Sequence, residues 1–434
     1  MRPPIAIPPT IRQRIHQTLR PQGRMFYGWR IVGASGGIQW LAGVLWMQSY
    51  GAYMVLLQED FGWSKALVAG AFALTRIESG LLGPFQGWLV DRFGPRLIAS
   101  IGTVLFSVGF ILFSRIESLL GFYLTFVVIA LGSSLGGFAT LMVAIVNWFD
   151  RNRAKAVAIS QMGFSVGGLT VPVVILALEA FGWRVTAFAS GLIVLVIGLP
   201  LCQVIRHRPG PYGEVPDGSD RGEPRVDGRR VRPLGAVDFT ARQAMRTPAF
   251  WLISFGHAFS LLAVSSMMVH LVPHLIEGLD YGLAAAGGVV ALMTGCQMLG
   301  QIGGGYLGDR FDKRIITALC MVSHGVGMVV IAYAQSFPMV IGFALLHGIA
   351  WGVRGPLMVA LRADYFGPGS FGTIMGFSSL IVMLGMSGGP IFAGYMADLY
   401  GSYEVGFLYI AGSSLLGALC FLFARPPSPT FKPS

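Results

Sequence analysis

The chain has 434 residues, of which 54% are hydrophobic and only 12% are charged, and its formal net charge is +11. This composition excludes an ordinary soluble globular domain, because apolar runs recur along nearly the whole length and need a bilayer to cover them. The positive charge does not indicate a nucleic-acid partner. The basic residues are scattered among short loops beside apolar runs, which is typical of membrane topology.

The apolar runs predict an all-α membrane protein with 12 transmembrane helices in two six-helix bundles. A helix that crosses a bilayer needs about 20 mostly apolar residues. In the first half of the chain the predicted spans are 27–57, 66–90, 97–114, 119–147, 154–180 and 184–205. In the second half they are 248–276, 282–308, 314–334, 337–362, 371–398 and 403–424.

These spans divide the chain into five parts. We expect an N-terminal tail at 1–26, a first bundle at 27–206, a linker at 207–247, a second bundle at 248–424 and a C-terminal tail at 425–434. The first tail is basic and Pro-rich and lacks the apolar core of a signal peptide. Lys and Arg concentrate in the loops on the side of the tails and linker, which predicts that both termini are cytoplasmic in a multi-pass protein of a bacterial inner (plasma) membrane.

A ten-residue motif occurs twice, each time at the end of a long apolar stretch. It reads GWLVDRFGPR at 87–96 and GYLGDRFDKR at 305–314. Four residues recur at an offset of 218 positions: Gly87 and Gly305, Asp91 and Asp309, Arg92 and Arg310, and Arg96 and Arg314. A duplication inside a membrane protein is typical of secondary transporters, whose binding site lies between two related halves. We expect the motif to gate the cytoplasmic side, with its charged groups reaching the partner half's helix ends or each other.

Charged residues inside the predicted spans mark candidate binding and coupling groups, because they are costly in hydrocarbon. A fixed cation beside aromatic groups suits a carboxylate, so Arg354, which is close to Trp351, and Arg76 are predicted to bind an anionic substrate. Glu78 is predicted to be the proton-coupling carboxyl. The alternative is a permanent Arg–Glu network that holds the helices together.

Other polar residues complete the candidate substrate site. Gln39 and Trp46 on the first span offer amide and aromatic contacts, and His257 on the seventh span offers an imidazole. His257, His270 and His347 could also relay protons, although a histidine within a helix bundle is more often a hydrogen-bonded packing residue. We expect no metal site and no cofactor, because the chain has no clustering of histidines, cysteines and carboxylates at metal-ligand spacing. The four cysteines lie in apolar stretches and are expected to be packing residues.

With the repeated motif in place, the sequence resembles the major facilitator superfamily over roughly residues 25–425. Shorter segments are similar to its monocarboxylate porter and oxalate/formate antiporter branch: YGWRIV at 27–32, FGWS at 61–64, RADYFG at 362–367 and GTIMG at 372–376. The span at 282–308 lacks the anion-binding arginine of that branch, and the span at 371–398 lacks the lysine of the oxalate exchanger. These two departures weaken the interpretation that an arginine and a lysine hold the two ends of a dicarboxylate.

The resemblance and the candidate residues together predict a secondary active transporter of a small, monocarboxylate-like organic anion. It is expected to work by alternating access as a monomer, with proton symport as the favoured coupling. The alternative is proton-coupled efflux of amphipathic drugs or metabolites. Against that alternative, Val128 stands where drug exporters carry an intramembrane arginine, and Pro172 is not part of a Gly-Pro pair. The expected partners are the organic anion, protons and the lipid bilayer. An enzyme is not expected, since no nucleophile and base can be paired.

Overall fold

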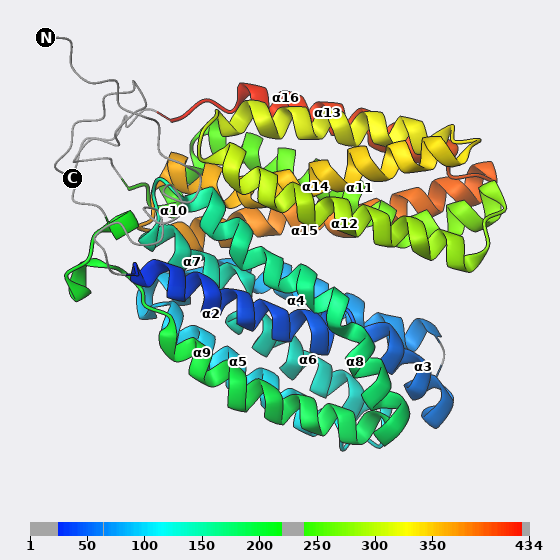
Figure 1. Ribbon diagram of the computed structural model, residues 1–434, viewed down its shortest axis with the longest axis horizontal. Helices are drawn as coiled ribbons and strands as arrows, with labels where there is room; N and C mark the ends of the chain where they lie inside the picture. Colours follow the sequence, from blue (N-terminus) through cyan, green and yellow to red (C-terminus); the bar gives the residue numbers. More distant parts are fainter. Residues whose placement is uncertain (1–24, 64, 219–237, 428–434) are drawn as a thin grey trace, which may run out of the picture.

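The computed structural model describes residues 25–63, 65–218 and 238–427, and these parts contain helices and no strand. Most of the two predicted tails, at 1–26 and 425–434, and part of the linker at 207–247 lie outside the described residues. The helices form two bundles that lie side by side along the long axis. In Figure 1 the first half of the chain forms the lower bundle and the second half forms the upper one.

Each bundle is built from consecutive helices. The first bundle contains α2 (Tyr27–Ala42), η1 (Gly43–Met47), α3 (Tyr50–Phe61), α4 (Lys65–Phe93), α5 (Pro95–Phe113), α6 (Leu119–Gly136), α7 (Phe138–Trp148), α8 (Arg153–Ile193), η2 (Val194–Gly198) and α9 (Leu199–Val204). The second contains α10 (Ala241–Met245), α11 (Pro248–Leu279), α12 (Leu283–Gly308), α13 (Lys313–Ala332), α14 (Phe337–Phe366), α15 (Phe371–Tyr400) and α16 (Glu404–Phe423).

Within the described residues, nine helical stretches are long and apolar enough to cross a membrane. One of them, Arg153–Val204, is 52 residues long and therefore too long for a single crossing. It is broken at Gly182, whose φ of 74° lies in the left-handed region that glycine adopts without strain, so it contains two of the predicted spans. Together with α4 and the α2–η1–α3 segment, these helices account for all 12 predicted spans. The expected all-α membrane fold is confirmed.

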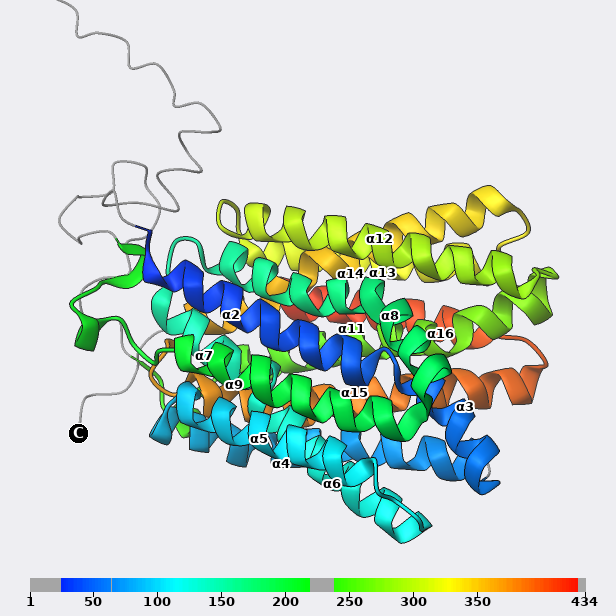
Figure 2. The same ribbon diagram turned by 60° about the horizontal axis from the view of Figure 1, so that its bottom comes forward.

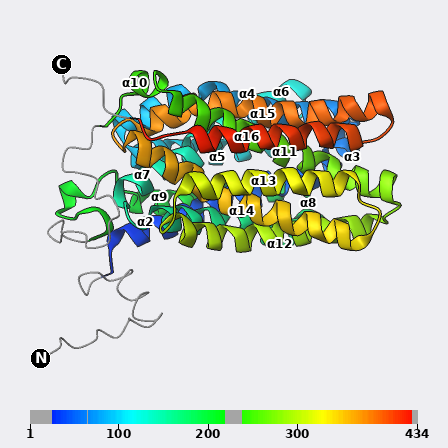
Figure 3. The ribbon, with the colours of Figure 1, turned by 90° about the horizontal axis from the view of Figure 1, so that it is seen from above.

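Helix α13, whose only basic or acidic interior residue is His324, has an apolar outer face. Four of its apolar side chains are at least 40% exposed and recur every three to four residues: Ile315, Leu319, Val322 and Val326. This spacing places them on one face of the helix. Figure 3 shows α13 and α16 on the outside of the second bundle, where such a face would contact lipid.

One end of the molecule carries both copies of the repeated motif, and we call it the motif end. It is the end at which α4 and α12 finish, and it lies on the left in Figures 1 and 2. The segment Arg206–Gly218 and the short helix α10 also lie there. The axes of the two bundles converge at this end and diverge toward the opposite end in Figure 1.

Candidate functional site

At the motif end, Asp91 of the first half docks on the first turn of α15 in the second half. Its carboxylate accepts hydrogen bonds from the backbone N–H groups of Gly372 (2.9 Å) and Thr373 (2.7 Å), and from the hydroxyl of Thr373 (2.7 Å). The first amides of a helix have no acceptor within the helix and favour a negative charge. Asp91 therefore caps a helix that belongs to the opposite half.

Asp309 makes the matching contact in the other direction. Its carboxylate accepts hydrogen bonds from the backbone N–H groups of Ala154 (2.9 Å) and Lys155 (3.3 Å) at the start of α8, and the Lys155 ammonium lies 3.8 Å away. Ala154 and Lys155 precede Gly372 and Thr373 by 218 positions. The sequence repeat therefore corresponds to a repeat in space, in which each half caps a helix of the other.

Burial raises the pKa of Asp309 to about 7, although Lys155 and the two amides oppose this shift. A released, solvated carboxylate has a pKa of about 4. The docked form consequently binds a proton more tightly than the released form. Proton binding at Asp309 thus favours docking, and this contribution is complete below about pH 4 and is lost as the pH rises through 7.

The motif glycines allow the helices to approach at these two docks. A Cβ atom on Gly87 would overlap the carbonyl oxygen of Gly372, and one on Gly305 would lie 2.9 Å from the Cβ of Ala158. The contact between α4 and α15 continues along both helices, because Gly83 packs against Gly376. Small residues at such crossings let two backbones touch.

The motif arginines stay within their own halves. Arg96 donates to the side-chain oxygen of Gln203 at 2.8 and 3.1 Å, and Arg314 donates to Asp312 at 2.9 Å. Arg92 lies over the ring of Trp88, and Arg310 lies 3.9 Å from the ring centre of Tyr306. In this arrangement the carboxylates and glycines join the two halves, while these arginine contacts stay within one half.

An ion pair between Arg153 and Asp364, which was not predicted from the sequence, reinforces the dock at α8. Arg153, which is only 3% exposed, forms an ion pair with Asp364 at the end of α14. Lys313 pairs with the second oxygen of Asp364 at 2.7 Å. The positions 218 residues from Arg153 and Asp364 are Phe371 and Val146, so the dock at α15 has no equivalent ion pair.

A third missed residue, Asp217, lies in the predicted linker and binds the turn that precedes α8. Its carboxylate accepts hydrogen bonds from the backbone N–H groups of Asp150 (3.0 Å), Arg151 (2.7 Å) and Asn152 (3.2 Å), and from the Asn152 side chain (3.2 Å). Successive amides of this kind form an anion-binding nest. The first part of the linker therefore holds the turn from which α8, the target of Asp309, begins.

We expect Asp217→Ala to loosen the start of α8. The substitution removes an acceptor from three backbone amides, and each lost bond to a charged group costs about 1.5–3 kcal/mol, less what water recovers. Hydrogen exchange should become faster at residues 150–155, and the melting temperature should fall. Asp217→Asn keeps one acceptor oxygen, and Asn tolerates the left-handed backbone conformation of this position (φ 60°). Its effect on exchange and on the melting temperature should therefore be smaller. Glu214→Gln serves as the control, and equal exchange in all variants would contradict the expectation.

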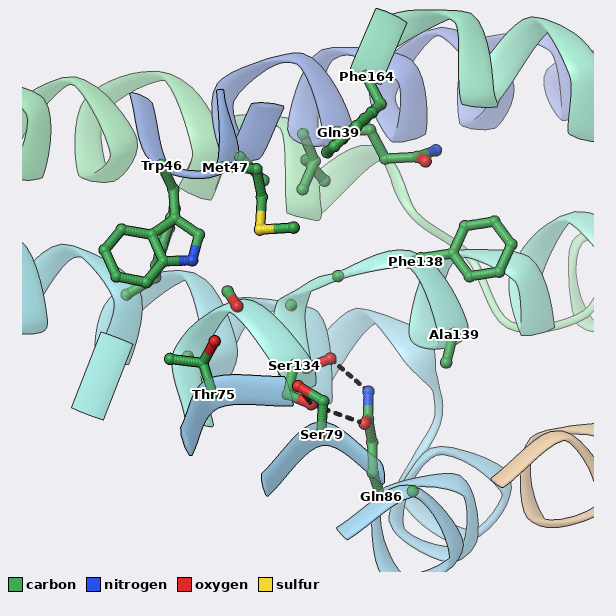
Figure 4. Close-up of a pocket in the computed structure, with 18 of the residues that line it drawn as sticks. Gln39, Trp46, Met47, Thr75, Ser79, Gln86, Ser134, Phe138, Ala139 and Phe164 are labelled. Carbon is green, nitrogen blue, oxygen red and sulfur yellow. Dashed lines mark hydrogen bonds between the residues drawn. The ribbon is translucent and has the colours of Figure 1, made fainter. Parts of the chain in front are cut away.

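A cavity of about 350 Å³ lies between α4 and its neighbours in the first half and α15 of the second half (Figure 4). No charged side chain lines it among the described residues. Its polar lining residues are Gln39, Thr75, Ser79, Gln86, Thr103, Ser133, Ser134, Ser379 and Ser387. Its aromatic and methionine residues are Trp46, Met47, Phe106, Phe138, Phe164, Met383 and Met386.

A hydrogen-bond network orders one wall of the cavity (Figure 4). The hydroxyl of Ser134 lies 3.3 Å from the side-chain oxygen of Gln86 and 3.4 Å from the hydroxyl of Ser79, and the Gln86 amide donates to the carbonyl of Ser134. On another wall, Gln39 donates to the backbone carbonyl and hydroxyl of Ser160. These bonds fix the side chains that a solute would meet.

The fourth span is interrupted at this cavity. Helix α6 ends at Gly136 and α7 begins at Phe138, with extended backbone at Gly137 between them (φ −91°, ψ −155°). Residues 136–139 all line the cavity. The first amides of α7 have no acceptor within the helix, so the break presents N–H groups and the positive end of a helix dipole where the cavity lies. The break was not predicted from the sequence.

The structure separates the predicted substrate-binding residues into two groups. Gln39 and Trp46 line the cavity. The residues predicted on α11 and α14 lie inside the second half instead. There, Arg354 is only 1% exposed, the imidazole of His257 lies 3.1 Å from Arg362, and Trp351 packs in a hydrophobic cluster.

Glu78 and Arg76 lie on α4. Glu78 is half-buried and accepts a hydrogen bond from the hydroxyl of Ser79 at 3.2 Å, and its other oxygen is buried without a partner among the described residues. The side chain of Arg76 lies outside the described residues. Position 76 is four and seven residues before Gly80 and Gly83, which both line the cavity, so it lies on the same face of α4.

Two related helical halves, reciprocal docks at one end and a cavity between the halves define a membrane transporter made from a duplicated bundle. The chain belongs to the Major Facilitator Superfamily, whose family model matches residues 37–296 and 253–434. Curated proteins similar to the chain are named as transporters, and together with the family match they confirm that it is a transporter rather than an enzyme.

Three relatives illustrate the similarity. The chain is 27% identical to MFS transporter asaE of Aspergillus flavus, with 79% of this chain and 73% of that protein covered. It is 26% identical to human Monocarboxylate transporter 11 (91% and 82% covered) and 24% identical to the Probable sulfoacetate transporter SauU of Cupriavidus necator (86% and 82% covered). These relatives are consistent with the predicted similarity to the monocarboxylate branch.

Among solved structures, the fold is similar to that of the Major Facilitator Superfamily transporter FucP in its outward conformation. The TM-score is 0.71 at 13% sequence identity, with 91% of this chain and 98% of that chain covered. At this level of identity the likeness concerns the fold.

Proposed function

We propose that this protein is a secondary active transporter of a small organic anion, a monocarboxylate or a related acid, and that it works by alternating access with proton symport. The observation that carries the proposal is the interrupted fourth span, which presents the amino end of α7 at a cavity next to the partner half. Half-helix amino ends at the middle of the membrane suit anionic solutes. Two relatives named for monocarboxylate and sulfoacetate transport point to the same chemical class.

The proposal assigns the motif end to the cytoplasm of a bacterial inner membrane. The halves at 27–206 and 248–424 would then be docked on the cytoplasmic side, with both termini on that side. In the next step Asp91 and Asp309 release α15 and α8, and the halves rock to open the cavity inward. The motif residues thus act as a gate and do not contact the solute.

Arg76 supplies the fixed positive charge in this proposal. Helix α4 runs antiparallel to α15, with Gly87 beside Gly372 and Gly80 beside Met383. One further turn brings position 76 level with Met386 and Ser387, which line the cavity. A fixed positive charge carried on this helix, together with the α7 amides, would suit the carboxylate of such a solute.

Replacement of Arg76 tests this proposal. In proteoliposomes that exchange a panel of radiolabelled mono- and dicarboxylates, Arg76→Gln should raise the half-saturating anion concentration about 10- to 100-fold, the equivalent of one charge-assisted contact. Arg76→Lys should retain part of the affinity. The exposed Arg115→Gln is the control and should behave like the wild type. Unchanged anion affinity in Arg76→Gln would exclude the assigned role.

A second function is favoured by one feature of the cavity. Its described lining is uncharged and rich in aromatic and methionine side chains, which also suits the amphipathic solutes of an efflux pump. The same exchange assay, extended to neutral amphipathic solutes, separates the two functions. Exchange of those solutes without any carboxylate exchange would favour efflux.

A further inference from the structure

The interior of the second half contains a cluster of buried polar groups that the transport cavity does not use. Arg354 and His347 lie on α14, and Thr317 and His324 lie on α13, and all four are at most 1% exposed. The two histidines face each other, with their Nδ1 atoms 3.1 Å apart. None of the four residues lines the cavity between the halves.

The two helices are antiparallel, and their contacts set the position of Arg354. Ser323 donates to the carbonyl of Leu346 at 3.0 Å, one residue before the facing His324 and His347. Arg354 lies seven residues from His347, and Thr317 lies seven residues from His324, both toward the motif end. Seven residues make about two helical turns, so each residue lies on the same face of its helix as the histidine. Arg354 is therefore level with Thr317 across the α13–α14 contact.

Polar atoms of these four residues lack hydrogen-bond partners among the described residues. They are Nε and Nη1 of Arg354, Oγ1 of Thr317, and Nε2 of both His324 and His347. Buried polar atoms are normally paired, so an unpaired group points to a bound water or ion. Five of the ten such atoms among the described residues lie on these two touching helices.

Charge decides which ligand fits. An arginine remains protonated inside a protein, and an unpaired charge in the membrane interior is costly. Helix α13 contains no carboxylate, and the only carboxylate of α14, Asp364, is paired with Arg153 and Lys313 at the motif end. The described residues therefore provide no counter-ion for Arg354.

The hydrogens available for bonding also favour an anion. Nε and Nη1 of Arg354 together offer three N–H hydrogens, and Thr317 offers one O–H. Because the two histidines share one proton between their Nδ1 atoms, one neutral ring has a free Nε2–H and the other a free lone pair. Donors thus outnumber acceptors, which excludes a metal cation as the fitting ligand.

We propose that Arg354 and Thr317, together with the His324–His347 pair, form a binding site for a compact monovalent anion such as chloride, inside the second half and separate from the transport cavity. Such an ion would neutralise Arg354 and hold α13 against α14. The site adds to the transport function proposed above and does not depend on it, because its ligand is inorganic and stays in one half.

Halide-dependent thermal stability tests this site without any transport measurement. The purified wild-type protein should melt at a temperature several degrees higher in sodium chloride or bromide than in sodium gluconate of equal ionic strength, because gluconate is too large for a buried site. Arg354→Met removes the charge and should abolish the halide effect. Thr317→Val removes one donor and should shift the halide titration to higher concentration. Ser323→Ala, on the same contact, is the control and should keep the wild-type response.

A structure determined in bromide provides a second readout that does not require a variant to fold. Anomalous density is expected between α13 and α14, within hydrogen-bond distance of Nε or Nη1 of Arg354. Identical melting of the wild type in chloride and gluconate would overturn the proposal. So would an undiminished halide effect in Arg354→Met, or a bromide crystal without density at this position.

Discussion

Asp91→Ala is expected to shift the protein strongly toward the conformation that is open at the motif end. The substitution removes the acceptor of three hydrogen bonds that join α4 to the first turn of α15. If the dock as a whole contributes about 3 kcal/mol, its loss changes the ratio of closed to open forms by roughly 100-fold. Since Asp91 does not line the cavity, this effect is expected on the conformational equilibrium and not on the chemistry of solute binding.

Spin labels at Phe93 and Phe311 can measure this shift. These two side chains are 51% and 58% exposed and lie at equivalent places in the two motif copies. The distance between them should lengthen in Asp91→Ala and change less in Asp91→Asn, which keeps one acceptor. Asp312→Asn is a matched control, because Asp312 is a motif-loop carboxylate that bonds only within its own half, to Arg314. Equal distance distributions in all proteins would exclude a gating role for the dock.

The repeat predicted more than the fold class. An offset of 218 residues relates Asp91 to Asp309, and the same offset relates Gly372 to Ala154 and Thr373 to Lys155. The motif showed which residues were duplicated, and a duplicated chain folds its copies into equivalent structures. The amides that receive each carboxylate could not be predicted, because they carry no side-chain signature.

The position of Arg354 was harder to predict for a physical reason. Helix α14 is apolar on most sides, so hydrophobic periodicity does not show which face of it points to the cavity. The sequence placed Arg354 with the substrate, whereas the structure places it two turns from His347, on the side of α14 that packs against α13. Asp217 was missed because a segment rich in Arg, Pro and Gly is typical of flexible linkers, and its nest of amides forms only after folding.

The break at Gly137 illustrates a similar limit. A glycine in this span can allow a close helix crossing, as Gly132 does where it meets the backbone of Phe106. The same residue type also permits an interrupted helix, and the two outcomes share one sequence pattern. Only the surrounding cavity distinguishes them, since an interrupted backbone inside a membrane needs a polar or hydrated neighbour.

Glu78→Gln should separate proton coupling from solute exchange. Gln has the same shape and still accepts the hydrogen bond of Ser79, but it cannot bind and release a proton. Uptake driven by an inward pH gradient should therefore be lost, while counterflow at equal pH should continue at a rate close to that of the wild type. The physical basis is that Glu78 is half-buried beside a cavity-lining residue, with one oxygen left unpaired to receive a proton.

The measurement is internal pH in proteoliposomes while a carboxylate enters. In the wild type the lumen should acidify with the solute, and in Glu78→Gln the acidification should disappear. Glu117→Gln, an exposed carboxylate between α5 and α6, is the control and should retain coupling. Full solute-driven acidification in Glu78→Gln would remove Glu78 from the coupling step and leave it as a helix-packing residue. Loss of counterflow together with coupling would place Glu78 in solute binding instead, because a pure coupling group is not needed when solute simply exchanges for solute.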